Sequence, residues 1–294
     1  MKNIFLLLSA ISIILLFSFT TLAQISGRPE TIPIKYEELN AGEFESALRL
    51  SDSICVIPMG ILEKHGPHLP LGTDLLDARE LTLRAANEEY FVVFPQYYFG
   101  QIYEAKHQPG TIAYSPELVW NLLDETCEEL ARNGFKKIVL ANGHGGNNYF
   151  LHYFAQAQLG DQKDYSVILF SPEPDSSVEK RINELRRTKI DGHAGETETS
   201  MIMAHRPDLA KTELGDQESG ENLNRLENLP YGFTGIWWYA RYPNHYAGDG
   251  SKADKQIGNL ILNHRAAQLV ELVKAVKNND EVLELQNEFF EKSK

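Results

Sequence analysis

Residues 136–147 have the sequence Lys136-Lys137-Ile-Val-Leu-Ala-Asn142-Gly-His144-Gly-Gly-Asn147, a short apolar run followed by a glycine-rich turn. The run from Lys136 to Ala141 has the pattern of a buried strand. A helix is expected directly after the turn, over Asn147–Leu159. A strand that passes through a tight turn into a helix is the repeating unit of a parallel α/β sheet.

Strand and helix patterns alternate on both sides of this unit. The segment from Ser115 to Gly134 is the clearest predicted helix. It has a Ser N-cap, a proline at the first helical position, one apolar face and a terminal glycine. The alternation predicts a three-layer α/β sandwich, in which helices cover both faces of a mostly parallel central sheet. The other expected strands are Ser53–Ile57, Phe91–Phe94 and Tyr165–Phe170, and the other expected helices are Asp74–Glu89 and Ser251–Val276, followed by an amphipathic tail over Asn278–Lys294.

The first 23 residues have the features of a secretory signal peptide. Lys2 precedes an apolar run from Ile4 to Phe17, and small residues ending at Ala23 follow. A membrane anchor is the alternative, but the run is short for a span of roughly 20 residues. We therefore expect a mature chain that begins near Gln24 and is soluble, secreted or periplasmic. Residues 24–294 are expected to form a single domain.

The composition excludes some kinds of partner. The chain has 41 Asp and Glu against 28 Lys and Arg, whereas a nucleic-acid surface needs clustered cations. We expect no nucleic-acid partner and, after signal cleavage, no membrane partner. Cys55 and Cys127 lie in apolar patterns, which indicates two buried thiols, and a single disulfide is the open alternative.

The first glycine-rich motif follows the strand that begins at Ser53. Ligands bind at the carboxyl ends of parallel strands, and this loop contains Glu63 and His65, with Asp74 beyond them. Two residues apart on an extended backbone, Glu63 and His65 point the same way and suit one metal pair. The alternatives are a solvated loop and, for Asp74, a plain helix N-cap supported by Asp77.

Two further motifs add imidazole and carboxylate groups. His144 lies between glycines, which allows close approach to a metal ion, although a turn histidine is the alternative. The third motif contains His193, Glu196 and Glu198 within six residues. We expect Glu198 to face the metals and Glu196 to be exposed or behind the ligands. Together the three motifs supply nitrogen and oxygen ligands for a two-metal hydrolytic centre.

The combination of motifs resembles the creatininase family, the creatinine amidohydrolases and their relatives. The resemblance implies a three-layer α/β subunit, usually in a homohexamer, with two divalent ions per subunit, Zn²⁺ or Mn²⁺ with Fe²⁺ as an alternative. It also implies hydrolysis of a C–N bond in a small cyclic or linear amide. The segments that carry it are Gly60-Ile-Leu-Glu63-Lys-His65-Gly-Pro-His68-Leu-Pro-Leu-Gly-Thr-Asp74, His107-Gln-Pro-Gly110-Thr111, Gly134 to Asn147, Gly192-His193-Ala-Gly195-Glu-Thr-Glu198-Thr-Ser200 and Ala247-Gly-Asp249.

The resemblance also assigns ligand roles. Glu63 and His144 match ligands of one ion, His65 matches a ligand of the other, and Asp74 matches the bridging carboxylate. One departure concerns Gly145 and Gly146, where creatinine-hydrolysing members have a bulky aromatic residue and a ligating glutamate. Glu198 is the nearest candidate to replace that glutamate. We therefore do not expect specificity for creatinine, and formamides, peptide-like amides and keto-inositol rings are alternatives.

The expected reaction is attack of a metal-bound hydroxide on an amide carbonyl. Glu198 is expected to collect the proton of the water, His193 to donate to the departing nitrogen, and His107 to orient the substrate. His68 and Asn147 are expected to support the ligands. A non-catalytic periplasmic small-molecule-binding protein on the same fold is the competing hypothesis. The remaining histidines are expected to be surface or packing residues: His152, His205, His245 and His264.

Overall fold

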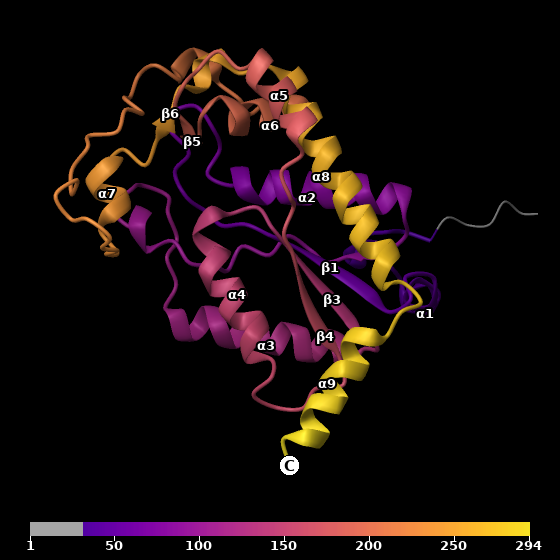
Figure 1. The fold of residues 1–294 in the computed structure, drawn as a ribbon. Helices are drawn as coiled ribbons and strands as arrows, with labels where there is room; N and C mark the ends of the chain where they lie inside the picture. The colour runs from indigo at the N-terminus through magenta and orange to yellow at the C-terminus, as the bar shows by residue number, and fades with distance from the viewer. Residues whose placement is uncertain (1–31) are drawn as a thin grey trace, which may run out of the picture. The chain divides into compact units, whose positions relative to one another are not determined.

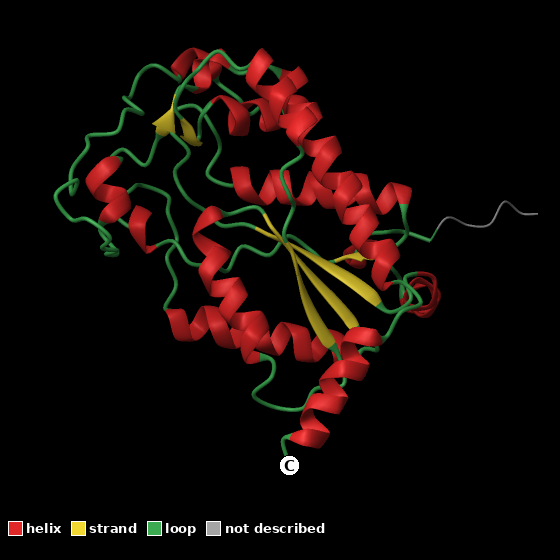
Figure 2. Cartoon of the chain, in the orientation of Figure 1, coloured by secondary structure: helices red, strands yellow, loops and turns green. Residues whose placement is uncertain are grey.

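The computed structural model describes residues 32–294, which form one compact unit. The predicted signal peptide, residues 1–23, and the expected mature start at Gln24 lie outside the described residues. Figure 1 shows the order of the helices and strands, and Figure 2 shows the main sheet at the centre of this unit, with a small pair of strands apart from it. Among the described residues, no helix combines the length and the apolar character needed to cross a bilayer.

The central sheet has four strands in the order β2-β1-β3-β4, and every neighbouring pair is parallel. This arrangement confirms the predicted parallel α/β sheet. A separate antiparallel pair, β5 with β6, lies beyond it. The strands are β1 (Ile54–Met59), β2 (Val92–Val93), β3 (Lys137–Asn142), β4 (Ser166–Phe170), β5 (Asp191–His193) and β6 (Ala247–Gly248).

Alternate side chains of the strands pack into two separate hydrophobic cores, one on each face of the sheet. Val56 and Val139 pack on one side with residues of α2 (Thr73–Glu88), α6 (Glu196–His205) and α8 (Lys255–Val276). Ile57 and Leu140 point to the other side. There they meet α1 (Ala41–Leu50), α3 (Pro116–Arg132) and α4 (Asn148–Ala157). The two cores explain the three layers, because every buried strand residue has a helix to cover it.

The observed start agrees with the sequence for α3 and differs from the expected one for α2 and α8. Ser115 accepts a hydrogen bond from the Leu118 N–H, as predicted for the start of α3. The N-cap of α2 is Gly72, so the alternative of Asp74 as a plain N-cap is wrong. The long C-terminal helix begins at Lys255 rather than Ser251, because Asp254 caps it and a short 3-10 turn precedes it. The remaining helices are α5 (Ser176–Leu185), α7 (Trp237–Arg241) and α9 (Glu281–Lys292).

The two cysteines are free and buried in the same core. The expectation of two buried thiols is confirmed, and the alternative disulfide is absent from the described residues. Burial raises the pKa of both the Cys55 and the Cys127 thiol above the ordinary range. Both side chains therefore act as small apolar groups in the core.

Candidate metal centre

The three glycine-rich motifs meet at the carboxyl ends of β1 and β3. Two glycines allow the start of α2 to approach these strand ends. A Cβ at Gly60 would lie 2.5 Å from the Leu75 nitrogen, and one at Gly143 would lie 2.8 Å from the Asp74 carbonyl oxygen. Asp74, the second residue of α2, is thereby held between Glu63 and His144.

Three sets of side chains in the described residues offer convergent ligand atoms. Glu63, Asp74 and His144 form one of them, which we call the compact group, and Glu63, His193 and His245 form another. Nδ1 of His144 lies 2.9 Å from Oε1 of Glu63 and 3.0 Å from Oδ2 of Asp74. All three side chains are buried. These two oxygens, Oε1 of Glu63 and Oδ2 of Asp74, are buried and have no hydrogen-bond partner among the described residues. Buried, unpartnered carboxylate oxygens that converge with an imidazole nitrogen fit a bound cation.

His65, His193 and Glu198 form the third set, the open group. Oε2 of Glu198 lies 4.0 Å from Nε2 of His65 and 3.8 Å from Nδ1 of His193. Nε2 of His65 is also 3.0 Å from Oδ1 of Asp74. Asp74 therefore presents one oxygen to each group, which is the geometry of a carboxylate that bridges two ions. Glu198 is 27% exposed, so this group reaches solvent.

Backbone carbonyls determine which ring nitrogen of each histidine faces the cluster of ligand atoms. Nε2 of His144 lies 2.9 Å from the Gln101 carbonyl oxygen, and Nδ1 of His65 lies 3.3 Å from the Glu63 carbonyl oxygen. Nε2 of His193 lies 2.9 Å from the carbonyl oxygen of Lys64. A carbonyl only accepts, so each of these nitrogens carries the proton. The opposite nitrogen of each ring faces the cluster, where it can offer its lone pair to a cation once any second ring proton has been displaced.

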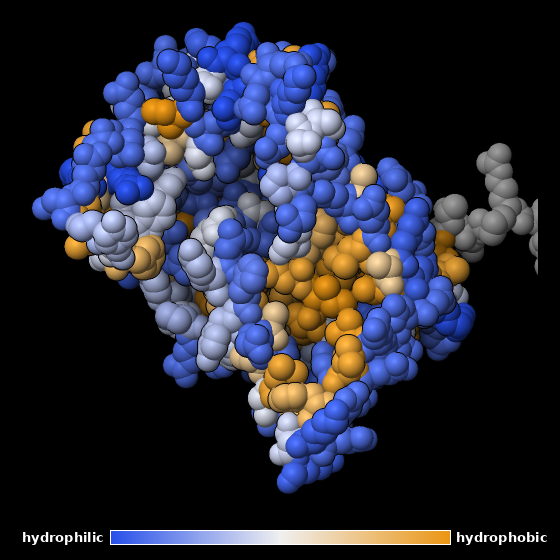
Figure 3. Space-filling view, in the orientation of Figure 1, coloured by the Kyte–Doolittle hydropathy of each residue, from blue (hydrophilic) through white to orange (hydrophobic). Residues whose placement is uncertain are grey.

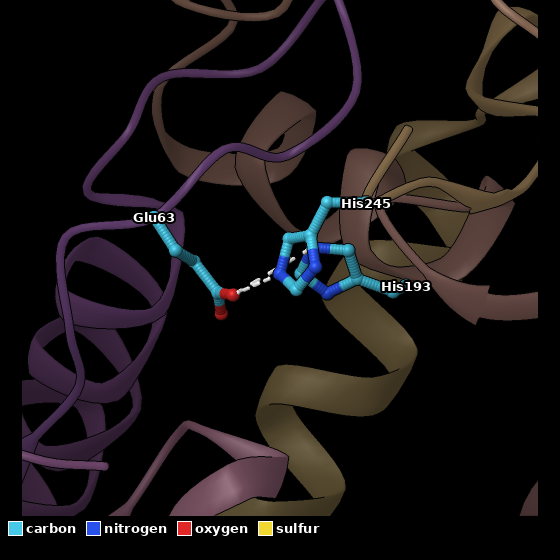
Figure 4. Close-up of side chains that lie close together, drawn as sticks. All are labelled: Glu63, His193 and His245. Carbon is cyan, nitrogen blue, oxygen red and sulfur yellow. Dashed lines mark hydrogen bonds and ion pairs between the residues drawn. The ribbon is translucent and has the colours of Figure 1, made fainter. Parts of the chain in front are cut away.

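His245 is the site residue that sequence reasoning missed. The prediction of a surface or packing role is wrong, because the ring is buried and hydrogen-bonds to Oε2 of Glu63. Figure 4 shows the Glu63 carboxylate directed toward the rings of His193 and His245. His245 lies far from the three motifs in sequence, and only the aromatic residues around it distinguish its neighbourhood.

The tautomer of His245 follows from Trp238. The indole Nε1–H of Trp238 donates to Nδ1 of His245 at 2.8 Å. An indole nitrogen cannot accept, so Nδ1 is the unprotonated nitrogen and Nε2 carries the proton. His245 therefore donates to Glu63 and holds its carboxylate in place, instead of presenting a lone pair to a cation. This contact orients a ligand of the compact group.

The charges in the cluster depend on one another. Burial opposes the charge on Glu63, but the imidazoles of His144 and His193 hold its pKa well below the usual range. Burial likewise opposes a charge on His144 and His65. The carboxylates of Glu63 and Asp74 outweigh it, raising the pKa of His144 well above its ordinary value and that of His65 to about 10. The buried carboxylates require positive charge, which protons or metal ions supply.

The two glutamates of the third motif separate as α6 begins. Glu196 is fully buried and accepts hydrogen bonds from the backbone N–H groups of Arg187 and Thr188, so the expected alternative of an exposed side chain is wrong. Glu198 turns toward the cluster and accepts a 2.5 Å hydrogen bond from the Ala194 N–H. The helix directs the two carboxylates apart, and Glu198 alone reaches the metal centre.

The remaining predicted residues lie around the centre or away from it. His107 is exposed, bonds to the Pro243 carbonyl at 2.9 Å and belongs to neither group, so its position gives no support to a role in orienting substrate. Asn147 accepts from the Gln101 N–H, in the loop whose carbonyl orients His144. His68 bonds to Thr199. The other histidines are packing or surface residues: His152, His205 and His264.

A cleft of about 700 Å³ opens beside the metal centre. His144 of the compact group and Glu198 of the open group are among its lining residues. Its walls come from β4, α5, α6 and α8, and the loop Ser171–Asp175 forms part of its rim. In the view of Figure 3, apolar surface gathers between α4 and α8, over β4, the last strand of the sheet. The cleft is in the size range of small-molecule sites, and it gives a substrate access to the open group.

Comparison with known proteins places these residues in a family context. A family model described as creatinine amidohydrolase, of the creatininase family, matches residues 37–273. The creatinine amidohydrolase of Pseudomonas putida is 28% identical over 186 residues, which span 58% of this chain and 72% of that enzyme. The mycofactocin precursor peptide peptidase of Mycolicibacterium smegmatis is 30% identical over 54% of this chain and 60% of its own length. The 3-dehydro-scyllo-inosose hydrolase of Thermotoga maritima is 29% identical over 38% of this chain and 36% of its own length.

Solved structures show the same fold. The crystal structure of a creatinine amidohydrolase superposes with a TM-score of 0.71 at 23% identity, covering 83% of this chain and 98% of that one. This likeness confirms the predicted three-layer architecture. Other creatininase structures with the fold are described as a Zn-Zn type and as a Mn form.

Proposed function

This chain belongs to the creatininase family of hydrolases, and from that premise we propose that it is a dinuclear metal-dependent amidohydrolase. The proposed reaction is cleavage of a C–N bond in a small linear or cyclic amide. The observation that carries the proposal is the position of Asp74, whose two oxygens face the compact group and the open group separately. A single buried carboxylate shared in this way is suited to two neighbouring ions.

The donor set divides between two cations. Glu63, His144 and Asp74 would hold one ion, and His65, Asp74 and Glu198 would hold the other. Zn²⁺ or Mn²⁺ suits such nitrogen and carboxylate ligands, and Fe²⁺ is an alternative. When bound, the ions supply a Lewis acid for the amide carbonyl and lower the pKa of a water molecule.

Two residues of the open group are placed to move protons. Glu198 lines the cleft, and a carboxylate oxygen that is not bound to the ion is the proposed acceptor of the proton from water. Nδ1 of His193 lies 3.8 Å from Oε2 of Glu198 and keeps its lone pair, because Nε2 donates to Lys64. We assign to this Nδ1 a relay role, in which it accepts the proton from Glu198 and donates it to the departing nitrogen. The backbone contact at Nε2 holds the ring in the orientation that this transfer requires.

The shape of the site favours a substrate other than creatinine. Nothing lies within 4 Å of a Cβ built on Gly145, so the cleft stays open where creatinine-hydrolysing members are expected to have a bulky aromatic side chain. A cleft of about 700 Å³ admits an extended amide. Among the relatives, one is named a peptidase and another an inosose hydrolase. We propose a peptide-like amide as the substrate, with an inosose-type ring as the second candidate.

The cellular setting remains a proposal from the sequence. Residues 1–23 have the signal-peptide pattern, and the family resemblance implies a homohexamer. We propose that the enzyme acts outside the cytoplasm as an oligomer. Cell fractionation with N-terminal sequencing of the mature protein, and light scattering of the purified protein, test the two statements. A protein found in the cytoplasm with residues 1–23 still attached would contradict the proposed export. A stable monomer would contradict the proposed oligomer.

The test of the enzymatic proposal is metal analysis joined to an amide screen. We expect two equivalents of Zn²⁺ or Mn²⁺ per chain and hydrolysis that stops with a chelator and returns with added metal. The variant His193→Ala should retain the metals and lose turnover, whereas His107→Ala, a change at an exposed histidine outside both ligand groups, should behave as wild type. Metal-loaded protein that binds small molecules tightly but hydrolyses no amide would favour the binding-protein hypothesis.

A further inference from the structure

Arg265 is a cation without a partner in the cleft. It lies on α8 and lines the same cleft as His144 and Glu198. Its side chain is exposed, and among residues 32–294 no carboxylate lies within ion-pair distance of it. Burial nevertheless lowers its pKa, while the charges of Asp77 and Glu198 raise it. The exposure and the lowered pKa together describe a side chain that is surrounded by protein but is in contact with water through the cleft. A guanidinium remains charged in such a place.

The other charged groups of the cleft have partners or lie at its rim. Arg186 lies 3.5 Å from Asp191. Asp175 accepts the N–H groups at the start of α5, and Glu198 accepts the Ala194 N–H. The exposed residues Glu173 and Glu179 lie along the rim. Arg265 is thus the cleft's free positive charge among the described residues, and the acidic rim disfavours a ligand with several negative charges.

Apolar side chains line the cleft together with Arg265. The wall includes Leu169 and Phe170 from β4, Met201 from α6 and Ile261 from α8. Ile261 precedes Arg265 by one helical turn, so the two share a face of α8. A ligand on this wall would contact apolar surface along its length and a guanidinium at one point.

We propose that Arg265 binds a carboxylate of the substrate, so that the enzyme acts on acidic amides such as N-acyl amino acids or peptides with a free C-terminal carboxylate. This inference rests on the proposed amidohydrolase function. The amide would lie at the metal centre, the apolar portion along Met201 and Ile261, and the carboxylate on the guanidinium. A planar guanidinium binds a carboxylate through two parallel hydrogen bonds, and it suits a single negative charge beside an acidic rim.

The test compares N-benzoylglycine with its uncharged analogue N-benzoylglycinamide on the metal-loaded full chain. Isothermal titration gives the affinity for each compound, and hydrolysis is followed in the same samples. We expect wild type to bind the acid about 10- to 100-fold more tightly than the amide, as for a charged hydrogen-bonded pair. Arg265→Gln should abolish the preference and Arg265→Lys should restore part of it. Arg186→Gln, a change at the paired arginine of the same cleft, should retain it.

Three results would overturn the inference. They are equal affinity for the two compounds, absence of binding by both, and a preference for the acid that survives in Arg265→Gln. The last would place the carboxylate on the metals. Hydrolysis separates this inference from the proposed function. Selective binding of the acid without hydrolysis of any amide would contradict the proposed amidohydrolase function and support the Arg265 site. Hydrolysis without a preference for the acid would support the amidohydrolase function and contradict the Arg265 site.

Discussion

The compact group and the open group share Asp74 but differ in packing. In the compact group the contacts with His144 measure 2.9 and 3.0 Å, and its three side chains are buried. In the open group Glu198 stays 3.8 to 4.0 Å from the two imidazoles and is partly exposed. The first resembles a closed set of ligands, and the second leaves room for a substrate or water.

The difference indicates how one cluster can divide two functions, retention of a metal ion and contact with the substrate. Buried ligands with fixed tautomers favour tight retention of an ion, because little reorganisation is needed on binding. An exposed carboxylate next to a cleft favours exchange and proton transfer. We infer that the compact group retains its ion during turnover and that the open group meets the substrate. The following changes test this division.

Replacing Asp74 should have the largest effect, because it is the residue that faces both groups. We expect Asp74→Asn to lower kcat/KM by at least about a thousandfold and to reduce metal content in both positions. Steady-state kinetics and elemental analysis measure the two effects. Asp77→Asn is the matched control, since Asp77 is a buried carboxylate on the same helix that pairs with His205. Loss of only one ion in Asp74→Asn would contradict the shared role.

Removing one ligand from each group should distinguish the two ions. Glu63→Gln should weaken binding of the tighter ion by at least about 100-fold, because it removes a ligand from a buried set. Glu198→Gln should weaken binding of the other ion and leave the more tightly bound ion in place. Competition with a coloured chelator measures both affinities. If the two variants lost the same ion to the same extent, the distinction between compact and open groups would be wrong.

His245 should affect the compact group through Glu63. We expect His245→Asn to lower the affinity for the tighter ion by about 10- to 100-fold, as for other residues that orient metal ligands. Trp238→Phe keeps the aromatic ring and removes the indole donor, so its effect should be smaller, about two- to tenfold. The same chelator competition applies. An unchanged affinity in His245→Asn, or a loss confined to the weaker ion, would show that the contact with Glu63 orients nothing.

Metal affinity should rise with pH in both groups. The raised pKa values of His65, about 10, and His144 mean that each ring carries a second proton, and hence a positive charge, at neutral pH when no metal is bound. Metal binding must displace those protons, so affinity should increase about tenfold per pH unit for each proton released, up to the raised pKa. Titration calorimetry in buffers of different ionisation enthalpy counts the protons. Binding without proton release would contradict the charge coupling in the cluster.

Local patterns were sufficient for much of the fold. The strand run of β3 and the Ser115 cap of α3 depend on neighbours in sequence, so their positions were predicted to within a residue or two. The start of α8 was less accurate, because Ser251 and Asp254 are both plausible caps and only the path of the preceding 3-10 turn selects one. The choice between Glu196 and Glu198 depended on where α6 begins relative to β5.

The amino-acid sequence by itself determined the fold class, the family and the donors of the three motifs, because strand periodicity, glycine-rich turns and ligand types are local properties. Only the tertiary structure brought Asp74 between two groups, placed His245 on Glu63 and left Arg265 facing the cleft. These features join residues up to 182 positions apart, as in the contact of His245 with Glu63. Such contacts arise from the packing of whole layers, which no short pattern encodes.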